Sequence, residues 1–278
     1  MGTMRDTLAR LGVEAKKSLG QNFMVDEGAL RRLAMAADLA GGDAVLEIGA
    51  GLGELTEALA ATARRVVALE IDRRFIDELE RRFGANPVVE VVQADILEAD
   101  LRALLGDDAA AYKVVANLPY YITSAIIRAL LEADTPPALI VITVQAEVAA
   151  RMAARPPDMS LLALGVQFYG SPEIVGKLGP EVFYPRPGVE SAVVRIEPHP
   201  AGPPLPPDQR RRFFRIARAG FSQPRKQLRN SLSAGLHLEP AAVVNWMHGA
   251  GLDPTRRAET LSVAEWLTLV DSAGDLAP

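Results

Sequence analysis

The sequence contains no cysteine, which excludes disulfide bonds and thiolate metal sites. It has only three histidines, His199, His237 and His248, and their spacing matches no metal-ligand pattern. Because imidazole and thiolate are the usual ligands of structural and catalytic zinc, we expect no metal in this protein.

Long apolar runs are also missing. No run approaches the ~20 residues of a membrane-spanning helix. The first segment, MGTMRDTLARLGVEAKKS, contains acidic side chains and lacks the apolar core of a signal peptide. The sequence therefore predicts a cytoplasmic protein with no membrane partner, and we expect a monomer.

Positive charge is scarce over most of the chain. The net charge is −5, and residues 1–208 hold 20 basic against 29 acidic side chains, whereas residues 209–278 hold 10 against 6. Most of the excess of positive charge in residues 209–278 lies between Arg210 and Asn230, a run with eight cations, no acid and three phenylalanines. Such a run is typical of a solvated helix face, but the interleaved aromatics also allow one face to pack while the other meets phosphates.

The pattern of the 278 residues indicates an α/β fold. Near-continuous apolar runs alternate with helical spacing, which is typical of a parallel sheet covered on both faces. The expected strands are 44–48, 65–71, 87–94, 113–118 and 138–145, and the expected helices are 26–40, 54–63, 73–83, 122–133 and 147–154.

A proline-rich segment, PHPAGPPLPP at 198–207, reads as a linker. Helical patterns dominate beyond it, at 208–219, 225–234, 240–250 and 262–272. We therefore expect two domains, 1–200 and a smaller all-helical domain at 201–278.

A glycine-rich turn, EIGAGLG, follows the first expected strand at 47–53. Glycines there let the backbone turn tightly and approach a ligand. A dinucleotide-binding loop would place its third glycine one position later, where Glu54 stands. Because Glu47 and Glu54 would also repel a pyrophosphate, the loop favours a ligand that is not polyanionic, although a turn without any ligand is an alternative.

Two carboxylates end the next expected strands. Glu70 can accept hydrogen bonds from both hydroxyls of a ribose, and Asp95 can accept from the exocyclic amine of an adenine. Each has an ordinary alternative, an ion pair with a neighbouring arginine for Glu70 and a helix N-cap for Asp95. Since ligands bind at the carboxyl ends of such strands, the glycines and both acids together predict a pocket for an adenosine with a neutral or cationic tail. S-adenosylmethionine fits this description, whereas a nucleotide polyphosphate fits it badly.

The fourth expected strand ends in Asn117-Leu118-Pro119-Tyr120. Asn117 offers a side-chain carbonyl, and Pro119 has no N–H, which helps to leave a nearby backbone carbonyl unpaired. Two acceptors converging on one point would hold an –NH₂ group, and Tyr120 could stack on the attached ring. Acceptors aimed at amine hydrogens stabilise the positive charge that develops when the nitrogen is methylated.

Several motifs occur together in a fixed order: SLGQNF (18–23), EIGAGLGELT (47–56), Glu70, the QAD of Asp95, NLPYYIT (117–123), FYPRPGVESAVVRI (183–196) and GFSQPRKQLRNSL (220–232). With LDPTRRAETLSVAEWLTL (252–269), they span nearly the whole chain. The sequence resembles the ribosomal RNA adenine N6,N6-dimethyltransferases, which modify two adjacent adenines near the 3′ end of small-subunit rRNA.

The resemblance implies a Rossmann-like S-adenosylmethionine-dependent methyltransferase domain at 1–200 and an RNA-binding helical domain at 201–278. It implies that small-subunit (16S) rRNA within an assembling ribosomal subunit is the partner. The cofactor would be held by Asn22, Met24, Gly49, Gly51, Glu70, Asp95 and Asn117. Asn117 and the Leu118 carbonyl would grip the target amine, Tyr120 and Phe183 would sandwich the base, and Lys16, Lys17 and the arginines of 210–229 would hold RNA phosphates.

The sequence departs from the family pattern at several positions. Ala146 and Gly188 stand where the family has lysine, PDMSLLAL (157–164) replaces a Tyr-Gly-x-Leu-Ser stretch, and Met24 replaces leucine. All but Met24 lie where RNA could be contacted, so they bear on the substrate and its affinity rather than on the reaction.

Three other functions are compatible with parts of this pattern. A large-subunit (23S) rRNA adenine N6-methyltransferase of the macrolide-resistance type would share the fold and site, although Leu118 and GFSQPRKQLRNSL (220–232) favour the small-subunit enzyme. A catalytically idle RNA-binding assembly factor is disfavoured by intact Glu70, Asp95 and Asn117. A nicotinamide-dependent oxidoreductase does not fit the glycine spacing.

Overall fold

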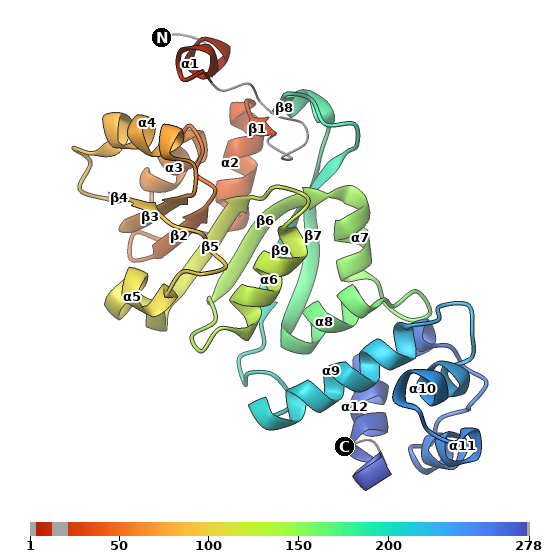
Figure 1. Cartoon of the computed structure of the whole chain (residues 1–278). Coiled ribbons are helices and arrows are strands. Elements are labelled where there is room, and N and C mark those ends of the chain that lie inside the picture. Colours follow the sequence, from red (N-terminus) through yellow and green to blue (C-terminus); the bar gives the residue numbers. More distant parts are fainter. Residues whose placement is uncertain (1–3, 13–21, 277–278) are drawn as a thin grey trace. The chain divides into compact units, whose positions relative to one another are not determined.

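The structure, a computed structural model, describes residues 4–12 and 22–276 (Figure 1). Lys16 and Lys17, for which the family resemblance implies phosphate contacts, lie outside the described residues. The described part of the chain forms two compact units, residues 1–149 with 172–198, and residues 150–171 with 199–278.

The first unit is built on a seven-stranded sheet of order β4-β3-β2-β5-β6-β9-β7. β2 to β6 are parallel to one another, and β9 runs antiparallel to β6. A separate two-stranded antiparallel ribbon joins β1 and β8. The strands are β1 (Phe23–Met24), β2 (Ala44–Ile48), β3 (Arg65–Glu70), β4 (Val89–Gln93), β5 (Tyr112–Asn117), β6 (Leu139–Gln145), β7 (Gly170–Leu178), β8 (Phe183–Tyr184) and β9 (Ser191–Pro198).

Helices cover both faces of this sheet, as the near-continuous apolar strands predict. Leu33 of α2 and Leu59 of α3 pack in one core with Val45, Val115 and Val141 from the sheet, while α6 lies on the other side of the strands from α2 (Figure 1). The helices of this part are α1 (Met4–Arg10), α2 (Glu27–Ala36), α3 (Glu54–Ala60), α4 (Arg73–Phe83), α5 (Leu101–Leu105), α6 (Thr123–Glu132) and the first half of α7 (Ala146–Ala153), with 3₁₀ turns η2 (Gly106–Ala110) and η3 (Pro180–Val182).

The second unit is helical. Phe168 packs against Phe213 and Phe214 with ring centroids 4.6 and 5.1 Å apart, and Phe221 stacks on the fully buried Trp266 at 5.4 Å. Its elements are α8 (Leu161–Tyr169), α9 (Pro207–Phe221), α10 (Leu228–Leu236), α11 (Pro240–Gly249), η4 (Ala258–Thr260), α12 (Val263–Asp271) and η5 (Gly274–Leu276).

The division into units differs from a single boundary at residue 200. Residues 150–171 group with the C-terminal helices because α8 places its aromatic side chains against α9. The chain therefore passes between the units three times.

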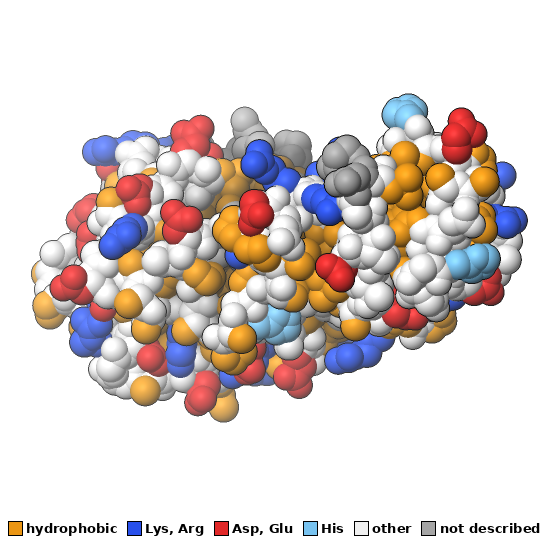
Figure 2. All heavy atoms as spheres, turned by 90° about the horizontal axis from the view of Figure 1, so that it is seen from below, with side chains coloured by type: hydrophobic (Ala, Val, Ile, Leu, Met, Phe, Trp, Pro, Cys, Tyr) orange, Lys and Arg blue, Asp and Glu red, His pale blue; other side chains and the backbone are white. Residues whose placement is uncertain are grey.

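On the face drawn in Figure 2, acidic and basic side chains are interspersed, and neither sign gathers into a broad area. In the part of the chain that the structure describes, no helix is both long and apolar enough to cross a bilayer. The same residues contain no group of three or more histidine, aspartate or glutamate side chains placed to hold a metal ion.

Candidate active site

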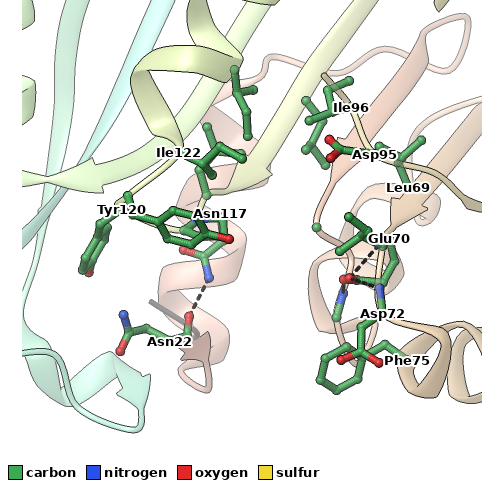
Figure 3. A pocket seen from close by; sticks show the side chains of 18 of the residues that line it. Asn22, Leu69, Glu70, Asp72, Phe75, Asp95, Ile96, Asn117, Tyr120 and Ile122 are labelled. Atoms are coloured by element: carbon green, nitrogen blue, oxygen red, sulfur yellow. Dashed lines mark hydrogen bonds between the residues drawn. The ribbon is translucent and has the colours of Figure 1, made fainter. Parts of the chain in front are cut away.

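A cavity of about 310 Å³ opens at the carboxyl ends of β2, β3, β4 and β5, which is where ligands bind in open α/β sheets. It is lined by most of the residues that the sequence singles out: Asn22, Gly49, Gly51, Glu70, Asp95, Asn117, Leu118 and Tyr120. Figure 3 shows Asn22, Asn117 and Tyr120 on one side of the cavity and Glu70 and Asp95 on the other.

The glycine turn after β2 forms the cavity floor. Gly49, Gly51 and Gly53 all have positive φ, at 74°, 56° and 87°, a conformation that other residues adopt only with strain. A Cβ at Gly53 would also approach Phe83 Cε2 to 2.5 Å, whereas a Cβ at Gly49 would meet nothing within 4 Å. The first glycine therefore leaves room for a ligand beside the backbone, and the third allows close helix packing.

Glu70 ends β3 with its carboxylate bound by the backbone. Its Oε2 accepts from Gly51 N at 2.9 Å, and its Oε1 accepts from Ile71 N at 2.8 Å and Asp72 N at 3.0 Å. Burial raises the pKa of Glu70, although the three N–H donors favour its charged form. The bonds join the glycine turn to the end of β3, and no arginine pairs with Glu70 among the described residues.

Asp95 follows β4, forms a hydrogen bond with the local backbone and also lines the cavity. Its Oδ1 accepts from Leu97 N at 2.9 Å, which is the turn-capping role that aspartate often fills. No donor of the described residues bonds to Oδ2, so one oxygen is available to a ligand.

Asn117 is fixed at two points. Its Nδ2 donates to the backbone carbonyl of Asn22 at 2.9 Å (Figure 3), and its Oδ1 accepts from the hydroxyl of Thr143. Because the Asn22 carbonyl can only accept, the nitrogen of the amide must face it. Oδ1 has a second lone pair for a further donor.

The turn after Asn117 presents the predicted unpaired carbonyl. The Pro119 carbonyl accepts from Ile122 N at 3.3 Å and from Thr123 Oγ1 at 3.0 Å. No donor among the described residues bonds to the Leu118 carbonyl. Asn117 and Leu118 therefore offer two acceptors in sequence at the cavity wall.

Tyr120 is anchored at its hydroxyl, which lies 2.7 Å from Oγ of the fully buried Ser191 on β9. Burial raises the pKa of Tyr120, so the phenol stays neutral at physiological pH. This contact holds the ring at the cavity wall.

Two predicted site residues lie elsewhere. Met24 and Phe183 are opposite each other in the β1–β8 ribbon, are 3% and 2% exposed, and belong to the hydrophobic core beneath it. The structure does not bring either side chain to the cavity wall, because the short ribbon turns both towards the core. Contact of Phe183 with a base stays a prediction.

Aromatic residues that the sequence did not single out line the cavity too. They are Phe23, Phe75 and Tyr121, of which Phe23 and Phe75 meet edge to face at 5.5 Å. Phe23 ends the SLGQNF motif and Tyr121 lies within NLPYYIT, so these motifs could have identified both residues. Phe75 looks like any core residue of an amphipathic helix.

The negative charge of the cavity indicates which kinds of ligand it can hold. Its described lining residues include three carboxylates, Glu70, Asp72 and Asp95, and neither lysine nor arginine. A polyphosphate would be repelled there, whereas a neutral or cationic ligand with hydroxyl and amine donors would be matched.

Glu47 is the residue of β2 just before Ile48 and Gly49, which line the cavity, and its own side chain is 1% exposed. Thr56 Oγ1 donates to its Oε2 at 2.6 Å. Burial, helped by the nearby charges of Glu54 and Glu70, raises the pKa of Glu47 to about 8. The folded protein therefore binds a proton that the unfolded chain releases near pH 4.5.

Because the pKa of Glu47 is raised, its stabilising contribution is complete below about pH 4.5 and is lost as the pH rises to about 8. We expect Glu47→Gln, which keeps a neutral side chain at every pH, to gain stability relative to the parent protein between pH 5 and pH 8.5. Urea unfolding midpoints of both proteins across that range measure the effect. A difference that does not change with pH would contradict a neutral Glu47 in the folded state.

A family model described as ribosomal RNA adenine dimethylase matches residues 12–275. The chain belongs to this family. Proteins named ribosomal RNA small subunit methyltransferase A are similar over nearly the full length. That of Dehalococcoides mccartyi (strain CBDB1) is 43% identical over 97% of this chain and 92% of its own. That of Geobacillus thermodenitrificans (strain NG80-2) is 40% identical over 96% and 94%.

Two solved structures of rRNA-modifying or adenosine-modifying methyltransferases share the fold. A dimethyladenosine transferase from Plasmodium falciparum superposes with a TM-score of 0.74 at 25% identity, covering 90% of this chain and 97% of that one. The 23S rRNA methyltransferase ErmE superposes with a TM-score of 0.71 at 29% identity, covering 90% and 99%. The predicted α/β, Rossmann-like methyltransferase fold is confirmed.

Proposed function

We propose that this dimethylase-family protein transfers methyl groups from S-adenosylmethionine to N6 of two adjacent adenines near the 3′ end of small-subunit (16S) rRNA. It would act as a cytoplasmic monomer on an assembling ribosomal subunit. The observation that carries the proposal is the pair of acceptors, Asn117 Oδ1 and the unpaired Leu118 carbonyl, facing a cavity whose far wall bears Glu70 and Asp95.

The acceptors and the negative charge of the cavity fit the hydroxyl and amine donors and the positive charge of S-adenosylmethionine. When bound, this cofactor supplies a methyl group on a sulfonium centre. Glu70 would accept from the ribose hydroxyls, Asp95 from the adenine amine through its remaining oxygen, and the open backbone at Gly49 would admit the methionine portion beside Gly51. Asn22 and Asn117 line the wall beside that portion.

The target adenine would be held by its exocyclic amine. Its two N–H groups would donate to Asn117 Oδ1 and to the Leu118 carbonyl, which aims the nitrogen lone pair into the cavity. As the nitrogen formed its bond to the methyl carbon, the bond from that carbon to sulfur would break and the sulfur would leave as a neutral thioether. The nitrogen would gain positive charge, which both acceptors would stabilise. One N–H proton would then pass to solvent water, so no strong base is needed at the site.

The base would have to leave its stack to reach this wall, since a stacked adenine cannot present N6 to a recessed site. Tyr120, held at its hydroxyl by Ser191, offers a ring face for the extruded base. Phe183 would close on the other face only after leaving its core position.

The basic run of the helical unit is the proposed surface for RNA phosphates. Five of its side chains are exposed and form no ion pair with any described residue: Arg211, Arg215, Arg218, Arg225 and Lys226. Cations without protein partners are free to replace the counterions of RNA.

Replacing Arg225 and Lys226 together by alanine is expected to weaken rRNA binding and to reduce the slope of log affinity against log salt concentration by about one to two. A filter-binding titration at several salt concentrations measures both. Arg31→Ala with Arg32→Ala, which removes the same charge from exposed positions on α2, is the control. Equal slopes for the parent and the Arg225/Lys226 variant would remove this run from the RNA interface.

The similarity to ErmE makes large-subunit rRNA the second candidate substrate. Purified protein, labelled methyl donor and unmethylated small and large ribosomal subunits, in separate reactions, separate the two. Label in two adjacent adenines of the small-subunit rRNA supports the proposal, and label in the large subunit overturns it. No label in either, with the methyl donor bound, indicates an idle assembly factor.

A further inference from the structure

One buried polar side chain beside the proposed site has had no role so far. Thr143 is 0% exposed and lies within β6, whose other interior residues are the apolar run Ile140-Val141-Ile142 and Val144. A buried hydroxyl costs stability unless it is hydrogen-bonded, and a valine of the same shape would suit this strand at least as well. The hydroxyl therefore needs an explanation beyond packing.

The sheet register supplies one. Thr143 is directly opposite Asn117 in the parallel β5–β6 pair, and its hydroxyl donates to Asn117 Oδ1. The other end of the same amide donates to the Asn22 carbonyl at 2.9 Å. The Asn117 amide is thus held at its nitrogen by Asn22, which precedes β1, and at its oxygen by the neighbouring strand β6.

The two contacts have different effects. The Asn22 carbonyl decides which end of the amide is nitrogen, because two facing oxygens would repel each other. It does not fix the position of Oδ1, which can still swing about the nitrogen contact. The bond from Thr143 occupies one lone pair of Oδ1 and so directs the other.

We propose that Thr143 is a positioning residue for methyl transfer, which holds Asn117 Oδ1 where it accepts from the target amine. The inference rests on the proposed function, since it assigns Thr143 to the amine-binding pair. Thr143 itself touches neither cofactor nor base, as its side chain is fully buried behind Asn117 and does not line the cavity.

Thr143→Val keeps the shape of the side chain and removes the hydroxyl. We expect it to lower kcat for adenine methylation about 10-fold, the scale of one neutral hydrogen bond lost from a preorganised site. The KM for rRNA and the Kd for the methyl donor should stay within about twofold, because the cavity wall is unchanged. Thr143→Ser, which restores the hydroxyl, should recover most of the lost kcat.

A double-mutant cycle separates positioning from a general effect on the fold. If Thr143 acts through Asn117, adding Thr143→Val to Asn117→Ala should cause no further loss of kcat. A full additional 10-fold loss in the double variant, or a parental kcat in Thr143→Val alone, would overturn the inference. Should Thr143→Val fail to fold, Thr143→Ala and Thr143→Ser give the same comparison.

The parent protein is assayed on the same subunits in every series. If the parent methylates no adenine, the proposed function fails, and the role of Thr143 in it falls for that reason. If the parent is active and the Thr143 series shows parental turnover, only the positioning role is wrong.

Discussion

Asn117→Ala is expected to lower kcat for adenine methylation by ~10²-fold or more, the scale for removing one acceptor or donor that acts in the transition state. The side chain provides one of the two acceptors at the proposed amine site, and its oxygen and nitrogen are already held by Thr143 and Asn22. Alanine leaves the Leu118 carbonyl alone to orient the amine. Single-turnover assays with labelled methyl donor measure the chemical step directly.

Cofactor binding should change little in this variant, because Glu70, Asp95 and the glycine turn are untouched. Calorimetric titration with S-adenosylmethionine checks that point. Asn245→Ala, an exposed asparagine of α11, is the matched control and should retain parental turnover. Near-parental turnover of Asn117→Ala would mean that the amine is gripped elsewhere.

Glu70→Ala is expected to raise the Kd for S-adenosylmethionine by ~10²-fold or more. Two ribose hydroxyls donating to one carboxylate form charge-assisted hydrogen bonds of about 1.5–3 kcal/mol each, and every 1.4 kcal/mol is about tenfold in affinity. Alanine also releases Gly51 N, Ile71 N and Asp72 N from their common acceptor, so Gly51 loses its bond to β3, while Gly49 N and Ala50 N keep theirs to the Leu69 carbonyl.

Glu70→Gln divides these two effects, because an amide oxygen in the place of Oε1 can keep the bonds from Ile71 N and Asp72 N without the charge. Its Kd should fall between those of the parent and Glu70→Ala. Glu98→Gln, at an exposed position near Asp95, removes the same charge without touching the cavity. Parental affinity in Glu70→Ala would assign the ribose to another residue.

The parallel part of the sheet was predictable because its strands carry their own signal. β2 (Ala44–Ile48) and α4 (Arg73–Phe83) have the bounds that the sequence indicates, and β5 (Tyr112–Asn117) differs by one residue at each end. Strands buried on both faces are apolar throughout, and the helices between them keep one apolar stripe. Local composition is enough to find such elements.

The antiparallel part was not predicted. β7 (Gly170–Leu178), at a sheet edge, is buried only at its two ends and mostly exposed between them, and the β1–β8 ribbon has two residues in each strand. Strands this short or this polar form only because distant partners are available. The burial of Met24 and Phe183 follows from that ribbon and was invisible for the same reason.

In the site, the residues at strand ends were predictable, but the residues that form hydrogen bonds with Asn117 and Tyr120 from other strands were not. Glu70, Asp95 and Asn117 stand out as polar side chains after apolar runs. Thr143 and Ser191 look like ordinary strand residues, and only the register of β5 with β6 and the position of β9 bring them to Asn117 and Tyr120. Cross-strand neighbours are set by topology, which a single sequence does not specify.

The interleaving of the two units along the chain limits how the protein can be dissected. A fragment that stops at residue 200 retains α8 but loses α9, and would expose Phe168 and Tyr169 to water without the rings they normally meet. Such a fragment is expected to aggregate. Isolating the first unit therefore requires internal excision of residues 150–171 together with removal of everything after Pro198.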